Sequence, residues 1–495
     1  MKVDEIAGEK FLYMSSSLKK QTISGILWST IQKIGTMGVA LVSNFILARL
    51  LSPEDYGCIG ILAIFIVVAE VFVNGGFASA LVQKKDPTDK DYSTVFYWNI
   101  ILSIVLYAVL YFSARSIAEF YKIPLLEYVL QVQGVIIIIH ALSVVQLNKM
   151  RKELDFKRLS VVQLVATTIS VVVAIAMAYS NCGVWSLVAQ QLVAALITTA
   201  LLWYVSRWRP ILCFSIKSFK ELFSYGSFML FSDLLNSICQ NIQGLIIGKR
   251  YSVTDMGFYS QASKLEQVPT TTISYVVSSV TFPVFSKLQN DKERLYTAVR
   301  KSIKMMNFLN FPLMILLMVV AEPLFIILFS DKWLESVPYF RILCIAGIVN
   351  CSQSVNYQVT AAVGRSQAIF RWNVIKRIVG LMLVFVGMYW GVEGILWAVV
   401  FGSYFVFVVN ALVAAPSTGY TLQKQVKDSI PCLMLASVSA LFVYPIEYLC
   451  EFSNMPLLLL QSIVYIIIYI SLARIFGLQE FNEIVEIIKP YIKRK

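Results

Sequence analysis

The chain has 495 residues, of which 58% are hydrophobic and only 14% are charged, and its mean hydropathy is +0.71. Soluble chains are nearer about 45–50% apolar and about 25% charged, so this composition excludes a soluble enzyme, a disordered chain and a DNA-binding domain despite the net charge of +13. A helix needs about 20 apolar residues to cross a bilayer, so the length fits many spans and leaves no room for a soluble domain.

Hydrophobic runs bounded by charges and turn residues predict fourteen transmembrane helices and an all-α polytopic membrane protein. We expect these helices near 22–47, 57–82, 93–114, 125–147, 159–180, 184–206, 219–248, 257–284, 298–320, 335–362, 370–390, 391–413, 428–449 and 455–476. The run from 298 to 329 is difficult to divide because Glu322 and Pro323 interrupt it.

The distribution of Lys and Arg predicts the orientation, because cytoplasmic loops carry the excess of basic residues. With the N-terminus inside, the cytoplasmic segments hold 33 of the 42 basic residues and the outer segments hold 7. Both termini are therefore expected in the cytoplasm. The net positive charge is interpreted as a topology signal that faces anionic lipid, and no nucleic-acid partner is expected.

An internal repeat relates the two halves of the chain. Residues 48–57 align with 248–257 at an offset of 200 and share a serine, an aspartate and a glycine. Basic and aromatic residues recur at the same spacing in 151–157 and 365–371. Both halves start from the same side, so the pattern predicts a parallel repeat of two six-helix bundles that enclose a cavity near the midplane.

The repeat and the loops predict six regions. They are a cytoplasmic segment at 1–21, a first bundle at 22–206, a linker at 207–218, a second bundle at 219–413, two additional helices at 428–476 and a basic tail at 477–495. In the tail, one helical face would hold Phe481, Ile484, Val485 and Ile488, which predicts an amphipathic helix at the membrane surface.

Ionisable residues inside spans are costly and are therefore candidates for function. Four such residues lie on spans 1, 2, 7 and 8, namely Lys33, Glu70, Asp233 and Lys264. The repeat places Lys33 and Asp233 at equivalent positions, so we expect them to pair across the cavity when no substrate is bound. A purely structural ion pair is the alternative. Glu70 is the candidate for coupling to H⁺ or Na⁺.

Polar side chains in spans 7 and 8 recur at helical spacing. Span 7 carries Asp233, Asn236, Gln240 and Gln243, and span 8 carries Ser260, Lys264, Gln267 and Thr271. Such a stripe on an apolar helix predicts a face that is turned from lipid towards protein or water. We interpret both stripes as cavity lining, with Lys33, Lys264, Asn236, Gln240, Gln243 and Gln267 as substrate-binding residues. Hydrogen bonds between helices are the alternative.

The lone histidine, His140, lies in the apolar run 135–141, where a packed and hydrogen-bonded imidazole is favoured over a proton-coupling role. No second histidine or cysteine cluster accompanies it, so no metal or other cofactor is expected. The basic clusters 149–158 and 365–377 are interpreted as topology determinants, with recruitment of an anionic lipid head as the alternative.

Several of these segments resemble the Wzx-type oligosaccharide-lipid flippases, or polysaccharide exporters, of the MOP superfamily. The matching residues are Ser17–Lys20, Gly25–Trp28, ARLLSPEDYG at 48–57, Ala80–Gln83, GVWSLVAQ at 183–190, Trp208–Pro210 and GFYSQA at 257–262. The turn Arg250-Tyr251-Ser252 departs from the glycine that is usual there. The family has no universal catalytic motif, so no residue role is transferred from it.

This resemblance implies two six-helix bundles in a V-shaped, MATE-like arrangement in the bacterial inner membrane. It also implies transfer of a polyprenyl-pyrophosphate-linked oligosaccharide, such as an O-antigen repeat unit of lipopolysaccharide, from the cytoplasmic to the outer leaflet. Polysaccharide polymerase and the chain-length machinery would be its candidate partners. An ion-coupled multidrug exporter of the same superfamily is the alternative, although that role calls for a more acidic cavity. A polymerase or glycosyltransferase is less favoured, because such enzymes need a long outer loop or a soluble domain.

Overall fold

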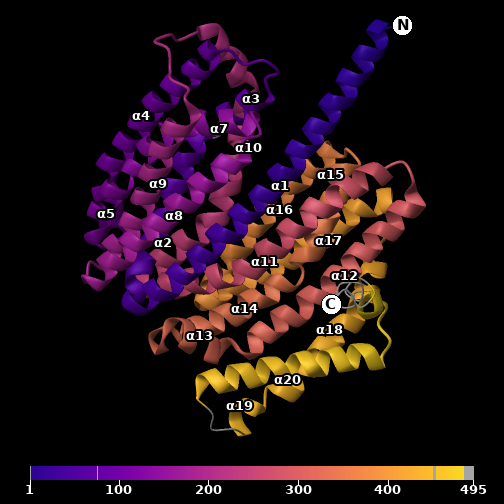
Figure 1. Ribbon diagram of the computed structural model, residues 1–495. Coiled ribbons are helices and arrows are strands. Elements are labelled where there is room, and N and C mark those ends of the chain that lie inside the picture. The colour runs from indigo at the N-terminus through magenta and orange to yellow at the C-terminus, as the bar shows by residue number, and fades with distance from the viewer. Residues whose placement is uncertain (1, 75, 450–452, 484–485, 487–495) are drawn as a thin grey trace. The chain divides into compact units, whose positions relative to one another are not determined.

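The computed structural model describes residues 2–74, 76–449, 453–483 and 486 of the chain, and every regular element in these ranges is a helix (Figure 1). The helices in chain order are α1 (Lys2–Leu50), α2 (Pro53–Asn74), α3 (Phe77–Gln83), α4 (Asp89–Tyr121), α5 (Leu125–Gln133), α6 (Val135–Ala141), α7 (Val144–Lys152), α8 (Phe156–Tyr179), α9 (Val184–Ser206), α10 (Ile216–Arg250), α11 (Val253–Leu288), α12 (Lys292–Val319), α13 (Ala321–Phe329), η1 (Asp331–Trp333), α14 (Ser336–Ile348), α15 (Asn350–Ala362), α16 (Ser366–Gly387), η2 (Met388–Trp390), α17 (Gly391–Thr418), α18 (Leu422–Val443), α19 (Ile446–Leu449) and α20 (Asn454–Ile475).

Ten helical segments of the described chain are long and apolar enough to cross a membrane, so the protein is a multi-pass membrane protein. One of them, Gln367–Thr418, covers two of the predicted spans. The predicted spans at 219–248, 257–284 and 335–362 are not among the ten. The first two fall in α10 and α11, whose polar stripes lower the mean hydropathy although each helix is longer than a bilayer requires. The third is divided between α14 and α15.

The chain forms two compact units, Met1–Met256 and Gly257–Lys495. In the first unit α1 packs on α8, α8 on α9, and α10 on α2, α3 and α4. In the second, α17 packs on α14, α15 and α16, whereas α12 packs on α18. The boundary between the two units thus lies after Met256. The linker predicted at 207–218 stays a prediction. The six-helix bundles inferred from the repeat, and the boundaries based on them, stay a prediction.

The repeated turns begin two helices with the same side-chain cap. Ser52 donates its backbone N–H and its hydroxyl to Asp55 Oδ2 at 2.9 and 3.0 Å, and the Asp55 N–H donates back to Ser52 Oγ at 3.3 Å. Ser252 and Asp255 repeat the hydroxyl–carboxylate bond at 2.7 Å and the return bond at 2.9 Å. The serine–aspartate spacing therefore specifies the start of α2 and of α11, as a capping box does.

Glycines bring α2 and the turn after it close to α10 and to the start of α11. A Cβ on Gly57 would lie 2.0 Å from the Val253 carbonyl oxygen, and one on Gly248 would lie 2.4 Å from the Ile61 side chain. Gly76 has a φ of +60°, and a Cβ there would lie 2.2 Å from the Gly226 carbonyl oxygen. Small residues of this kind allow close packing of membrane helices, where no hydrophobic force distinguishes helix from lipid. These glycines allow α10 to pack closely on α2 within the first unit.

Polar contacts outside the apolar segments also hold α10 and the preceding linker. Lys84 pairs with Asp91 of α4 at 3.1 Å and with Glu221 of α10 at 3.2 Å. Burial lowers the pKa of Lys84, but its hydrogen bonds to these two carboxylates more than compensate and the pKa is raised. The Trp208 indole N–H donates to Asp89 Oδ1 at 3.2 Å, so the linker is fastened to the start of α4.

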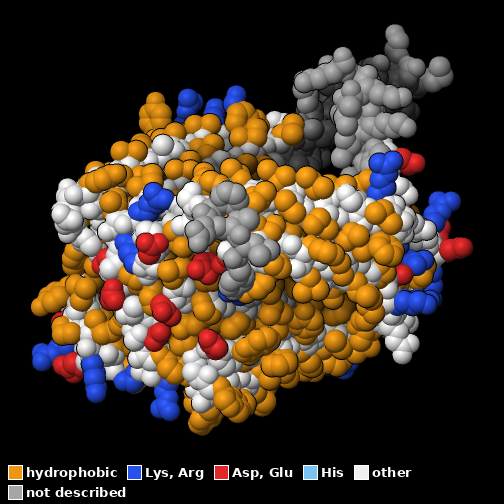
Figure 2. Space-filling view, turned by 90° about the horizontal axis from the view of Figure 1, so that it is seen from below, with side chains coloured by type: hydrophobic (Ala, Val, Ile, Leu, Met, Phe, Trp, Pro, Cys, Tyr) orange, Lys and Arg blue, Asp and Glu red, His pale blue; other side chains and the backbone are white. Residues whose placement is uncertain are grey.

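The second unit is joined to its C-terminal helices by buried tyrosines. The Tyr469 hydroxyl of α20 donates to the Phe308 carbonyl of α12 at 3.0 Å, and the Tyr465 hydroxyl donates to the Ala436 carbonyl of α18 at 3.1 Å. The opposite face of α20 exposes Met455, Leu459, Ile463, Ile466, Ile467 and Ile470. Figure 2 shows hydrophobic side chains over much of one face of the molecule. An exposed apolar surface is expected where a membrane protein meets lipid.

The helix expected in the tail at 477–495 falls partly outside the described residues, which end at 483 apart from Glu486. Ile484, Val485 and Ile488 lie outside them, so the amphipathic face predicted there stays a prediction.

Candidate functional site

The polar stripe on α10 is open to its surroundings. Asp233 and Gln240 are exposed, and Asn236 and Gln243 are partly exposed. The Gln240 amide donates to Asn236 Oδ1 at 3.4 Å, one turn away on the same helix. The stripe thus presents carboxylate and amide groups on a helix long enough to cross the membrane.

The stripe on α11 has the same character with a positive charge in it. Lys264, Gln267 and Thr271 are exposed. The Gln267 amide donates to Ser263 Oγ at 3.0 Å, and the Thr271 hydroxyl donates to the Gln267 carbonyl at 2.6 Å. Both hydrogen bonds lie within α11, and the side chains of Lys264, Gln267 and Thr271 remain exposed.

Glu266 lies on the other side of α11. Its side chain is buried, with 8% exposure, and accepts a hydrogen bond from the Thr270 hydroxyl at 2.6 Å. The neighbouring Lys264 is exposed. Residues two positions apart point to different sides of a helix, so Glu266 is buried while Lys264 is exposed.

Lys33 and Asp233 are not paired in this structure. Both side chains are exposed, and within the described part of the chain no ion pair joins them within 4.0 Å. Farther along α1, Ser43 is buried and its hydroxyl accepts a hydrogen bond from the Gln190 amide of α9 at 3.0 Å. Ser43 therefore helps to hold α1 and α9 together, whereas Lys33 is exposed on the same helix. The role of Lys33 and Asp233 in transport stays a prediction.

Glu70 and His140 form an ion-pair contact that sequence reasoning did not identify. His140 Nδ1 lies 2.8 Å from Glu70 Oε1, and this contact links α2 to α6. The side chains of His140 and Glu70 are 33% and 25% exposed. Glu70 was a candidate alone, and a packed, hydrogen-bonded imidazole was favoured for His140, but 70 positions separate them and no local pattern links them. The contact brings a carboxylate and an imidazole together inside the first unit.

A buried polar network in the second unit was also missed. The Ser352 hydroxyl donates to Asn307 Oδ1 at 2.7 Å, and Asn356 and Gln425 exchange amide hydrogen bonds at 2.9 and 3.1 Å. Nearby, Arg300 makes two hydrogen bonds to Asp428 at 2.6 and 2.9 Å. These bonds hold α12, α15 and α18 together, so we assign the network to structure rather than to the site. Its only signal in the sequence is a few amides within apolar runs.

No group of three or more His, Cys, Asp or Glu side chains that could hold a metal ion occurs among the described residues. Among the candidate residues, the first unit holds Lys33, the exposed stripe on α10 and the Glu70–His140 pair, and the second unit holds the exposed stripe on α11.

Similar proteins of known structure share this fold. The chain aligns with a structure of the lipid II flippase MurJ in an inward closed conformation with a TM-score of 0.74 and 16% identity, covering 91% of this chain and 98% of that one. A multidrug resistance MATE family transporter of the MOP superfamily aligns with a TM-score of 0.62 and 15% identity, over 80% of this chain and 98% of that one. These similarities confirm the predicted MATE-like fold class.

Relatives in sequence point to polysaccharide biosynthesis. The teichuronic acid biosynthesis protein TuaB of Bacillus subtilis is 26% identical, over 72% of this chain and 74% of its own length. The succinoglycan biosynthesis transport protein ExoT of Rhizobium meliloti is 27% identical, over 85% of this chain and 83% of its own. The family described as "Polysaccharide biosynthesis protein" matches residues 46–338, which is more than half of the chain. The chain therefore belongs to this polysaccharide biosynthesis family, and the resemblance to the MOP-superfamily polysaccharide flippases is confirmed.

Proposed function

We propose that the protein is a flippase that moves a polyprenyl-pyrophosphate-linked oligosaccharide from the cytoplasmic to the outer leaflet of a bacterial inner membrane by alternating access. Its family and the names of its relatives support a role in polysaccharide biosynthesis. The observation that carries the proposal is the exposed polar face of α11, with Lys264 and Gln267 in an otherwise apolar protein. A pyrophosphate crossing hydrocarbon needs both a cation and hydrogen-bond donors.

In this proposal the polar residues of the two stripes and Lys33 bind different parts of the substrate. Lys264 and Lys33 provide positive charge for the pyrophosphate, while Asn236, Gln240, Gln243 and Gln267 provide amide groups that donate to and accept from sugar hydroxyls. The substrate is moved without chemical change. Both termini lie in the cytoplasm, and the delivered glycan passes to a polymerase and its chain-length machinery.

The Glu70–His140 pair is the proposed site of the coupling ion. A proton that binds between a carboxylate and an imidazole changes the charge of the pair, and it therefore changes the energy of keeping the pair inside the membrane. Na⁺ would instead need the carboxylate oxygens and would compete with the imidazole for Glu70. Flipping driven by a pH gradient in Na⁺-free buffer distinguishes the two ions.

The test of this function is flipping in proteoliposomes that contain a fluorescent polyprenyl-pyrophosphate-linked oligosaccharide, measured by protection of the glycan from a membrane-impermeant glycosidase. We expect the Lys264→Gln and Lys264→Ala variants to lose about tenfold in initial rate and Lys264→Arg to retain most of it, because charge-assisted contacts to phosphate are lost. Lys287→Ala, which removes an exposed charge elsewhere in the same unit, is the control.

A wild-type rate no higher than that of protein-free liposomes would refute the flippase. Equal rates for Lys264→Gln and Lys264→Arg would show that Lys264 acts through packing. Transport of a fluorescent organic cation in place of the glycan would favour the multidrug exporter.

A further inference from the structure

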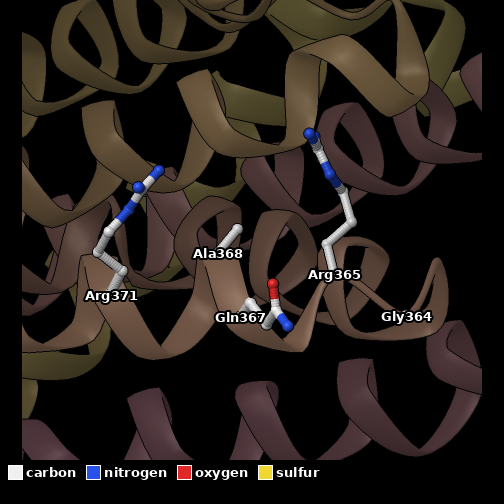
Figure 3. A pocket seen from close by; sticks show the side chains of 5 residues that line it. All are labelled: Gly364, Arg365, Gln367, Ala368 and Arg371. Atoms are coloured by element: carbon white, nitrogen blue, oxygen red, sulfur yellow. The ribbon is translucent and has the colours of Figure 1, made fainter.

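A pocket of about 600 Å³ lies where α15 meets α16. Its lining residues are Gly364, Arg365, Gln367, Ala368 and Arg371. Figure 3 shows the side chains of Arg365 and Arg371 extending to the same side of the ribbon, with Ala368 between them. The small alanine leaves open the space that the two guanidinium groups border.

The turn before α16 fixes the position of Arg365. The Arg365 N–H donates to the Thr360 carbonyl at 3.2 Å and the Gly364 N–H donates to the Ala361 carbonyl at 3.0 Å, which closes the end of α15. Gly364 has a φ of +78°, a conformation that favours glycine. Arg365 Nη1 then donates to the Val413 carbonyl at 3.3 Å and to Ser417 Oγ at 3.4 Å, so α17 steadies one of its nitrogens.

The pocket carries positive charge without a matching carboxylate. Residues 336–392 contain five basic residues and no Asp or Glu. Within the described ranges, Arg371 makes no ion pair within 4.0 Å and no hydrogen bond from its side chain. Arg365 has only neutral acceptors among the contacts above. Two guanidinium groups beside an open volume, with the Gln367 amide between them in sequence, attract an anion.

The geometry points to a binding site for the pyrophosphate group of the lipid-linked substrate, occupied before that group reaches the exposed stripes. This inference rests on the proposed function. Each guanidinium presents a planar fork of donors that fits one phosphate, so two arginines suit two linked phosphates better than one. The pocket also lies in the basic cluster 365–377, which the sequence predicts on the cytoplasmic side, where such a lipid is made available.

The alternative is that Arg365 and Arg371 only set the topology. Topology depends on positive charge and treats lysine and arginine alike, whereas two-pronged recognition of phosphate requires arginine. The double variant R365K/R371K keeps both charges and removes both forks, so it separates these roles. The matched control K287Q/K292Q removes two exposed charges from the same unit outside the pocket.

Binding is measured with radiolabelled farnesyl pyrophosphate on the full-length protein in phosphatidylcholine nanodiscs, with phosphatidylglycerol and inorganic phosphate as competitors. We expect R365K/R371K to weaken binding about tenfold and the control to leave it unchanged. Equal affinity of wild type and R365K/R371K would overturn the proposal, and so would equal weakening by the control. Displacement of the probe by phosphatidylglycerol or phosphate at the probe's own concentration would show a general anion site and would also overturn it.

If the double variant does not fold, R371K alone gives the test, since the Arg371 side chain makes no hydrogen bond in the described structure. The flipping assay separates this inference from the function on which it rests. We expect R365K/R371K to raise the substrate concentration for half-maximal flipping about tenfold and to leave the maximal rate unchanged. Wild-type flipping together with unchanged half-saturation in the variant would reject the pocket alone. Arginine-dependent binding without any wild-type flipping would reject the function alone.

Discussion

The Glu70–His140 contact predicts measurable coupling between α2 and α6. Fully exposed ion pairs contribute about 0–1 kcal/mol, whereas breaking a fully buried pair costs about 3–5 kcal/mol. With His140 and Glu70 33% and 25% exposed at a separation of 2.8 Å, the coupling falls between these limits. We expect a coupling energy of about 1–2 kcal/mol.

The assay is a double-mutant cycle of wild type, Glu70→Gln, His140→Gln and the double variant. Unfolding free energies come from titration with sodium dodecyl sulfate in mixed micelles. The cycle isolates the interaction between the two side chains from their separate contributions to stability. Glu153→Gln, an exposed carboxylate in the loop after α7, is the control and should change the stability by less than about 0.5 kcal/mol.

The same variants test the proposed coupling site. Both single variants should fold and still bind farnesyl pyrophosphate, but flipping should no longer respond to a pH gradient. A coupling energy below about 0.3 kcal/mol would mean that the contact contributes nothing measurable. A pH-driven rate in Glu70→Gln equal to that of wild type would remove the pair from the coupling mechanism.

Two further predictions concern packing and topology. Gly76→Ala should destabilise the first unit by about 2–4 kcal/mol in the same unfolding assay, because its Cβ would lie 2.2 Å from the Gly226 carbonyl oxygen and its φ is positive. The control is Gly38→Ala, whose Cβ would meet nothing within 4 Å. Equal stability of the two variants would contradict the close contact. In a cysteine-free background, single cysteines at Lys332 and Asn454 should react with an impermeant maleimide from outside intact cells, whereas cysteines at Asp155 and Asn290 should react only after permeabilisation. Outside labelling at Asp155 would refute the predicted orientation.

Local features of the chain were predictable because their causes are local. The serine–aspartate spacing in 52–55 and 252–255 specifies two helix caps, and the structure forms both. Polar residues at helical spacing predicted that one face of α10 and of α11 is turned from lipid towards protein or water. Asp233, Gln240, Lys264 and Gln267 are exposed, and the cavity lining stays a prediction. Apolar runs predicted the position of most membrane-length helices. The polar stripes lower the mean hydropathy of α10 and α11, so a hydropathy criterion does not include them among the membrane-length helices.

Contacts between distant parts of the chain could not be predicted, because the sequence carries no sign of which helices are neighbours. The Glu70–His140 contact and the Asn356–Gln425 pair each join residues about 70 positions apart. The packing of α10 on α2 and on the turn after it depends on glycines such as Gly226 and Gly248. In the sequence these glycines only interrupt an apolar run and do not indicate a neighbouring helix. The pocket at Arg365 and Arg371 depends on the turn at Gly364, which positions Arg365 at the start of α16. The sequence assigned this basic cluster to topology, with recruitment of an anionic lipid head as the alternative.

The exposed charges constrain what surrounds α1, α10 and α11. A charged side chain that faces lipid at the centre of a bilayer costs about 2.5–3.5 kcal/mol even by the lower estimates. Three such charges, on Lys33, Asp233 and Lys264, would together cost about as much as the whole stability of many domains. We expect these side chains to be hydrated or to contact polar groups of the protein rather than to face lipid, because either arrangement removes that cost. A hydrated surface with both charges and amides can accept and release a pyrophosphate and its sugars, because water replaces the substrate's contacts when it leaves.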